Sequence, residues 1–163
     1  TSWSEQQKLT ASDVASRDRF GFSVAIDGDT VVVGAEEDDD NGKNSGSTYI
    51  FTRDGADWTQ EAKLTASGGE NSDRFGHSVA LDGDTVVVGT FNDDNDNTDD
   101  TGSAYVFTRS GTSWSEQARL TASDADYDDE FGRSVVIDGG TVVIGAPSDD
   151  DNGANTGAAY ISP

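Results

Sequence analysis

Hydrophobic and polar residues alternate along short segments of the chain, and this pattern predicts β-strands. In residues 20–26 every second side chain is large and apolar, which places four of them on one face: Phe20, Phe22, Val24 and Ile26. An Asp-Gly-Asp turn at residues 27–29 predicts a tight hairpin into the apolar run 31–33. Two further strands are expected at 48–53 and 58–64, the second with one face formed by Trp58, Gln60, Ala62 and Leu64. No segment has helical periodicity, so the predicted class is all-β.

The four-strand pattern occurs three times, at intervals of 55 and 56 residues. The shared landmarks are Trp3, Trp58 and Trp114, and the Phe-Gly pairs that begin at Phe20, Phe75 and Phe131. We expect one domain over residues 1–163, with units at about 20–67, 75–123 and 131–163. Residues 1–12 repeat the fourth strand of a unit, whereas the third unit ends in its third strand. The strand at 1–12 is therefore expected to complete the third unit, in its own chain or in a second copy.

A Phe-Gly pair, an apolar strand and then Val-Val-Gly-Ala resemble the FG-GAP repeat, the blade unit of integrin-alpha-like β-propellers. The residues that match are Phe20-Gly21 with Gly34-Ala35, Phe75-Gly76 with Gly89, and Phe131-Gly132 with Gly145-Ala146-Pro147. The third motif is complete, whereas the first has Glu36 where Pro is expected and the second reads Gly-Thr-Phe. The resemblance implies four-stranded antiparallel blades around a central axis and a role in recognition.

The number of blades limits the architecture. Propellers typically have four to eight blades, so three blades cannot close a ring of normal size. We expect two chains to form a homodimer with six blades, in which the strand at 1–12 provides the closure. A β-trefoil also has three four-stranded units and is the alternative, but its repeats are usually shorter and lack the Phe-Gly pattern.

Charge narrows the range of partners. The chain has 163 residues, of which 32 are acidic and 10 basic, and its formal net charge is −22. This charge excludes nucleic acids and anionic membrane surfaces, because both are bound through Lys and Arg. Asp outnumbers Glu, Lys is scarce and only 33% of residues are hydrophobic, as in proteins of extreme halophiles and haloarchaeal members of the resembled family.

Other compositional features exclude further classes. The absence of Cys excludes disulfides, zinc-thiolate sites and a Cys nucleophile. No apolar run reaches the ~20 residues of a membrane span, and no signal peptide is recognised. The family resemblance implies that the parent protein is extracellular or at the cell surface.

The acidic residues are expected to gather on one face. In an up-and-down blade, the loops between the second and third strands lie on the same side as the connections between blades. These loops and connections contain 22 acidic and four basic residues, a net charge of −18. We therefore expect a polarised acidic face, suited to cations or to a protein or glycan bridged by cations.

Within these loops, oxygen-bearing side chains alternate as in calcium-binding loops of the EF-hand type. The candidate Ca²⁺ ligands are Glu37, Asp39, Asn41, Asp94, Asp96, Asp150 and Asn152. No Glu at the twelfth position completes the coordination, so three interpretations stay open: a solvated loop, a weak Ca²⁺ site, or a partner site. Integrin-like repeats hold calcium between their first two strands, but the turns at 27–29, 82–84 and 138–140 have too few oxygens, and we expect no calcium there.

Candidate catalytic groups are few. His77 is the single histidine and is expected at the surface, because its counterparts are Phe22 and Arg133, so a Ser-His-Asp triad has no support. We expect a non-catalytic module for recognition or scaffolding. The alternative is a carbohydrate-binding or glycan-hydrolysing propeller that uses an acidic pair or the tryptophans: Trp3, Trp58 and Trp114. A third interpretation is an excised or engineered set of blades that only assembles.

Two further sets of residues recur once per unit and are expected to be structural. Tyr49, Tyr105 and Tyr160 occupy one strand position and should pack within the blades. Asp18, Asp73 and Asp129 precede the Phe-Gly pairs and should accept hydrogen bonds in turns.

Overall fold

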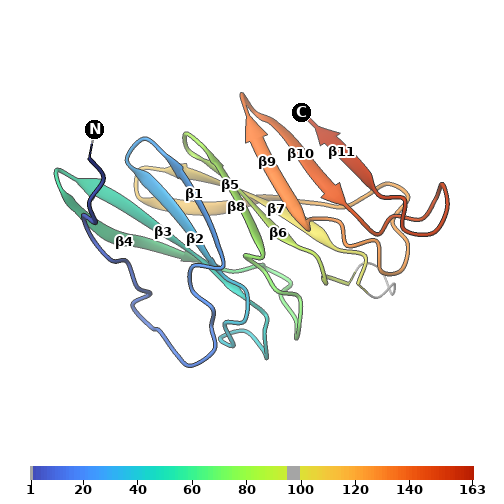
Figure 1. Ribbon diagram of the computed structural model, residues 1–163, viewed down its shortest axis with the longest axis horizontal. Helices are drawn as coiled ribbons and strands as arrows, with labels where there is room; N and C mark the ends of the chain where they lie inside the picture. The colour runs from blue at the N-terminus through green and yellow to red at the C-terminus, as the bar shows by residue number, and fades with distance from the viewer. Residues whose placement is uncertain (1, 95–99) are drawn as a thin grey trace.

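A computed structural model describes residues 2–94 and 100–163, and three antiparallel sheets stand side by side in it (Figure 1). The first sheet contains β1 (Ser23–Asp27), β2 (Thr30–Ala35), β3 (Ser47–Asp54) and β4 (Asp57–Leu64). The second contains β5 (Ser78–Asp82), β6 (Thr85–Thr90), β7 (Ser103–Ser110) and β8 (Ser113–Leu120). The third contains β9 (Ser134–Asp138), β10 (Thr141–Ala146) and β11 (Ala158–Ser162).

The strands of each sheet are neighbours in sequence order, so each sheet is an up-and-down blade. The predicted all-β class with antiparallel blades is confirmed: in the described residues two blades have four strands and the third has three. In the described residues, no helix has the length and apolar character needed to span a membrane.

The core lies between the blades. One cluster joins blades 1 and 2 and contains Val32, Ile50, Leu64, Phe75, Val86, Tyr105 and Phe107. A second cluster joins blades 2 and 3 and contains Ala80, Val87, Phe131, Ile137, Val142 and Ile144. Burying a large apolar side chain contributes about 1.5–3 kcal/mol. Each blade is therefore stabilised largely by its neighbour.

Two glycines bring neighbouring blades into backbone contact. A Cβ atom added to Gly34 of β2 would lie 2.0 Å from the carbonyl oxygen of Gly76, in the Phe-Gly turn of the next blade. The same oxygen accepts a hydrogen bond of 2.7 Å from Ser23 Oγ. Gly89, Gly132 and Ser78 repeat this arrangement between blades 2 and 3. The Phe-Gly pair of one blade contacts the glycine that follows the valine run of the preceding blade, and this contact explains why the two motifs recur together.

The Phe-Gly turns make the first strands shorter than predicted. β1 begins at Ser23 and not at Phe20, because Gly21 has a φ of +92°, which ends the extended conformation. Phe20 does not continue the row of strand side chains. Its ring packs edge-on against Tyr49 at 5.5 Å and Phe51 at 6.0 Å between ring centroids.

A β-bulge reverses the side chains of the fourth strand. The pairing of β3 with β4 shifts between Ile50 and Phe51, so Glu61 is an extra residue on β4. Trp58 therefore packs on one side of the blade, whereas Leu64 packs toward blade 2 on the other. The prediction of a single face is wrong for the following set: Trp58, Gln60, Ala62 and Leu64.

The N-terminal segment covers the outer side of blade 1. Leu9 and Ala11 pack against this blade, as Leu64 and Ala66 pack against blade 2. The Gln7 side chain donates to Trp58 O at 2.9 Å and accepts from Trp58 N at 2.8 Å. The segment thus takes the place of the outer strand of a preceding blade.

The same segment does not extend the third blade of its own chain. β11 is an edge strand, and the two chain ends lie at opposite ends of the row of blades (Figure 1). Completion of the third unit within one chain is therefore not observed. Completion by a second copy stays a prediction.

We expect Gly89→Ala to lower the free energy of unfolding by about 2–4 kcal/mol. The added methyl group would lie 2.0 Å from the carbonyl oxygen of Gly132 and 2.2 Å from Ser78 Oγ, so the two blades would have to separate. Gly68→Ala is the matched control, because nothing lies within 4 Å of its added Cβ. Urea denaturation followed by circular dichroism measures both variants, and equal effects would contradict the expectation.

Candidate functional site

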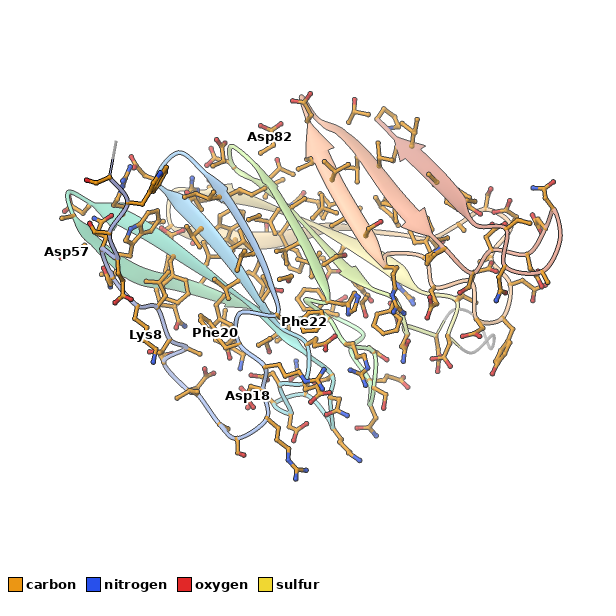
Figure 2. All side chains as sticks on the ribbon, viewed as in Figure 1. Lys8, Asp18, Phe20, Phe22, Asp57 and Asp82 are labelled. Atoms are coloured by element: carbon orange, nitrogen blue, oxygen red, sulfur yellow. The ribbon has the colours of Figure 1, made fainter. Side chains whose placement is uncertain are left out.

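The predicted gathering of the acidic loops on one side of the blades is observed. The β2–β3 loop and the connection after β4 are joined by backbone hydrogen bonds, from Ser72 N to Lys43 O at 2.8 Å and from Phe75 N to Ser45 O at 2.9 Å. Asp18 lies at this side, and Asp82, in a hairpin, lies at the opposite one (Figure 2).

Among the described residues of this face, seven carboxylates are buried: Asp18, Glu36, Asp38, Asp73, Asp93, Asp129 and Asp149. Buried carboxylates require hydrogen bonds or cations. Much of the expected acidic surface therefore belongs to the internal structure of the loops, which the sequence did not indicate.

Three of these carboxylates hold the turns before the Phe-Gly pairs. Asp18, Asp73 and Asp129 each accept a hydrogen bond from the amide three residues earlier, at 2.6, 2.5 and 2.7 Å. The residues on both sides of each of them have positive φ angles, so the turn is tight. Their predicted role as turn-forming groups is confirmed.

The repeated tyrosines connect the blade core to other carboxylates. The Tyr49 hydroxyl lies 2.9 Å from Asp13 Oδ1 and 2.9 Å from Asp38 Oδ2. Tyr105 donates to Asp93 Oδ2 at 2.9 Å in blade 2. The predicted packing is confirmed for Tyr49 and Tyr105, which are fully buried. The role of the hydroxyl was missed, although each tyrosine follows its partner aspartate by 11 or 12 residues.

In blade 1 a lysine lies among three carboxylates. Asp13, Asp38 and Asp40 form the blade-1 cluster, and in the described residues they are the one acidic group whose oxygens lie within 4.8 Å of one another. Lys63 Nζ lies 2.8 Å from Asp13 Oδ2 and 3.1 Å from Asp38 Oδ2, and it also contacts Asp40. The ammonium group thus occupies the position that a cation would take.

The pKa values follow from this arrangement. Desolvation alone would raise the pKa of Asp38, but hydrogen bonds from the Asp40 amide, Tyr49 and Lys63 outweigh it and lower the pKa. Desolvation alone would lower the pKa of Lys63, but its bonds to the carboxylates raise the pKa well above the usual range. Asp38 and Lys63 therefore both stay charged at neutral pH.

Blade 2 uses an arginine at the same position. Arg119 Nη2 lies 2.9 Å from Asp93 Oδ1, and Arg119 Nε donates to Asp93 Oδ2 at 3.0 Å. The guanidinium also lies 5.9 Å from the ring centroid of Tyr105. Asp93 is only 4% exposed, and desolvation therefore raises the pKa of its carboxyl despite the nearby arginine.

Blade 3 has the carboxylates and the tyrosine of the other blades. Tyr160 donates to Asp149 Oδ2 at 2.7 Å and lies 2.9 Å from Asp124 Oδ1. Desolvation and the charges of Asp124 and Asp149 raise the pKa of Asp151. In the part of the chain that the structure describes, no Lys or Arg forms an ion pair with Asp124, Asp149 or Asp151. In the described residues the third sheet has no strand beside β11, the place from which β4 and β8 bring a cation in the other blades.

The predicted calcium ligands are partly engaged with other groups. Glu37 pairs with Arg19 at 3.2 Å and Arg74 at 3.3 Å. Asp39 Oδ1 accepts the amide of Asn44 at 2.7 Å, and Asp94 Oδ1 accepts the amide of Asp100 at 2.9 Å. Of the others, Asn41, Asp150 and Asn152 are exposed on their loops, and Asp96 lies outside the described residues. Calcium binding by these loops stays a prediction.

His77 lies between blades, and only 15% of its side chain is exposed. Its ring packs between Phe22 and Phe91, with centroid distances of 5.0 and 4.4 Å. Its Nδ1 lies 2.7 Å from Oε2 of the buried Glu36, which also pairs with Arg19 at 2.9 Å. The surface expectation is wrong because the Phe-Gly turn brings this position against the preceding blade.

Two of the three tryptophans are structural. Trp58 and Trp114 each lie under a guanidinium, of Arg53 at 5.3 Å and Arg109 at 5.2 Å. Both pack against the core clusters. Trp3, in contrast, is 96% exposed.

We expect Lys63→Ala to create a Ca²⁺ site in the blade-1 cluster. Three carboxylates within 4.8 Å would lose the ammonium group between them, and Ca²⁺ prefers such oxygen ligands. Calorimetry at low salt should show binding to this variant, and Ca²⁺ should raise its Tm more than that of Lys43→Ala, an exposed lysine with the same charge change. Equal Ca²⁺ binding and equal rises in Tm for the two variants would contradict this expectation. Heat of Ca²⁺ binding measured with the unaltered chain would instead support the acidic loops as Ca²⁺ sites.

We expect Asp73→Asn to stabilise the protein at pH 7. Desolvation and the charges of Asp93 and Asp94 raise the pKa of Asp73 to about 6, against 3.8 normally. The stability given by protonated Asp73 is complete below pH 3.8 and is lost as the pH rises through 6. Asn keeps the acceptor for the Glu70 amide, so the variant should gain about 1–2 kcal/mol at pH 7 and almost nothing at pH 4. Urea denaturation across this pH range would contradict the expectation if the difference were constant.

The comparison with known proteins finds the same repetition. A sequence profile described as the FG-GAP repeat matches residues 3–51, 58–107 and 114–162. Each match begins at a tryptophan of an outer strand or of the N-terminal segment and ends in the third strand of the next blade. One sequence repeat therefore contributes to two blades. Among curated proteins, none matches the chain.

Proposed function

The chain belongs to the FG-GAP repeat family, and from this premise we propose that it is a non-catalytic β-propeller module for recognition or scaffolding, completed by a second copy. One observation supports the proposal. The exposed face of blade 1 and the exposed face of blade 3 correspond to the two surfaces that meet wherever neighbouring blades contact each other within the chain. This contact occurs twice within the chain, at Gly34 with Gly76 and at Gly89 with Gly132.

The face of blade 1 supplies one side of the contact. Val24 and Ile26 are 67% and 66% exposed. Their equivalents in blade 2, Val79 and Leu81, pack against blade 1. No atom of the described residues lies within 4 Å of a Cβ added to Gly21, whereas Gly76 and Gly132 contact a preceding blade at this position.

The face of blade 3 supplies the other side. Val136 and Ile161 are 54% and 73% exposed. The equivalent residues of blade 1 belong to the hydrophobic cluster between blades 1 and 2. A hollow of about 530 Å³ on this face is lined by Ser134, Gly145, Gly157 and neighbouring residues. The equivalent residues of blade 1 receive the Phe-Gly turn of blade 2: Ser23, Gly34 and Gly46. The hollow therefore fits Phe20-Gly21 of a second copy.

Joining the faces of two copies gives a homodimer with six blades, within the usual range of four to eight. The two joints are identical, which is the arrangement of a closed symmetric dimer. Both joints bury apolar side chains that are otherwise exposed, each contributing about 1.5–3 kcal/mol. The edge of β11 is then paired, so that each blade of the ring has four strands.

The acidic loops then form the recognition surface of this ring. The loop carboxylates that are exposed, Asp39 and Asp150 among them, suit Ca²⁺ or a protein or glycan bridged by cations. The family resemblance supports an extracellular or cell-surface parent protein, and the composition supports a halophilic source. A carbohydrate function has less support, because Trp58 and Trp114 lie under arginines and inside blade contacts.

We expect the chain to sediment as a dimer at micromolar concentration in 1 M salt, and Gly145→Ala to sediment as a monomer with unchanged circular dichroism. Within one chain, a Cβ on Gly145 closely approaches only the movable Ser134 Oγ, at 2.5 Å. In the dimer it would meet the Gly21 carbonyl of the partner, as Gly34 and Gly89 meet a carbonyl at 2.0 Å. A monomeric unaltered chain, or a dimeric variant, would contradict the proposed assembly.

A further inference from the structure

We propose that Lys8 of a second copy binds the carboxylates of blade 3, inserting its ammonium group between Asp124, Asp149 and Asp151 beside Tyr160. This inference rests on the proposed homodimer and names the charged contact that sets its register. The partner is a second copy of this chain.

The sequence places Lys8 at the position of the two cations that act within the chain. Lys63 follows Trp58 by five residues and Arg119 follows Trp114 by five, as Lys8 follows Trp3. The three cations also precede the same sequence, Leu-Thr-Ala-Ser. The N-terminal segment thus carries the outer-strand pattern complete with its basic residue.

Blades 1 and 2 show what a cation at this position does. Lys63 pairs across the sheet with Tyr49, and Arg119 pairs with Tyr105. From there Lys63 Nζ reaches Asp38 Oδ2 at 3.1 Å, and Arg119 Nη2 reaches Asp93 Oδ1 at 2.9 Å. The same pairing places Lys8 of one copy opposite Tyr160 of the other.

Blade 3 presents the matching carboxylates. Asp149 is only 3% exposed and accepts the Tyr160 hydroxyl at 2.7 Å. Asp149 occupies the position of Asp38 and Asp93, both of which are paired with a cation. A buried carboxylate without a cation is costly, and a charge-assisted hydrogen bond from an ammonium group removes much of that cost.

Lys8 is available for this contact. Its side chain is exposed, and it forms no ion pair with any residue in the described ranges. The segment around it is held to its own blade 1 through side chains, from Gln6 to Ala56 O at 2.7 Å and from Gln7 to Trp58 O at 2.9 Å. Its backbone pairs with no strand of the described chain, so it is free to extend β11 of a partner.

Electrostatics makes this contact selective. Two chains that each carry −22 repel one another, and salt weakens that repulsion. A specific cation among carboxylates favours the one register in which Lys8 faces Asp149. Any other register would leave the carboxylates without a cation, because Lys8 is the one basic residue in the sequence of residues 1–12.

Sedimentation equilibrium in 1 M salt tests the contact with three variants of the full chain. We expect Lys8→Ala to raise the dimer Kd about tenfold or more, and Lys8→Arg to keep it within about threefold, because Arg119 serves at the same position. Lys43→Ala is the matched control, since it removes the charge of an exposed loop lysine. If the unaltered chain is a monomer, the homodimer itself is wrong. If it is a dimer and Lys8→Ala matches Lys43→Ala, only the Lys8 contact is overturned.

A cross-linking experiment tests the register separately. Ile50 pairs with Ala62 and Val106 pairs with Ala118, so Ile161 of one copy should face Gln7 of the other. The chain has no Cys, so Gln7→Cys mixed with Ile161→Cys should form a disulfide-linked heterodimer on oxidation. Gln7→Cys mixed with Ala159→Cys, two residues out of register, should cross-link far more slowly. Equal or absent cross-linking in a dimeric sample would overturn the register.

Discussion

The contact between two glycines of neighbouring blades is the constraint on which the rest of the structure depends. Gly34 of β2 and Gly76 of the Phe-Gly turn approach so closely that neither position has room for a side chain. This approach fixes the spacing of the sheets, brings the Ser23 hydroxyl onto the Gly76 carbonyl, and sets the depth to which Phe75 enters the core. The loops that carry the carboxylates start from these same strand ends, so their geometry follows from the contact.

Much of the negative charge of the chain has a structural role. Asp18 and its equivalents hold the turns that present the Phe-Gly pairs, and Asp38 and its equivalents join a tyrosine to a cation. Each such cation belongs to the outer strand of its blade. When the outer strand pairs with the sheet, its basic side chain therefore also neutralises the loop carboxylates. A blade without its outer strand therefore lacks both hydrogen-bond pairing and charge balance.

Much of the fold was predictable from the sequence, because alternation, Asp-Gly turns and a repeat of 55 or 56 residues are local signals. The bulge at Glu61 was not predictable, because the extra residue does not change the hydrophobic pattern of the strand in a recognisable way. The side of the acidic loops followed from strand topology alone. Their burial did not, because Lys63 and Asp38 are 25 residues apart and meet only once β4 has paired. His77 was misplaced for a similar reason: its partner Glu36 lies in another blade.

The phase of the repeat explains why assembly and charge are linked. Each sequence repeat runs from an outer strand into the three inner strands of the next blade, so no repeat forms a complete blade alone. Within the chain, every blade that has its outer strand also has a basic residue among its carboxylates, Lys63 in one and Arg119 in the other. The residue that continues this series is Lys8, on a segment that already stands in the outer-strand position against blade 1. Lys8 and the edge strand β11, whose carboxylates have no cation beside them in the described residues, thus lie at opposite ends of the same chain, and the proposed pairing of two copies rests on this arrangement.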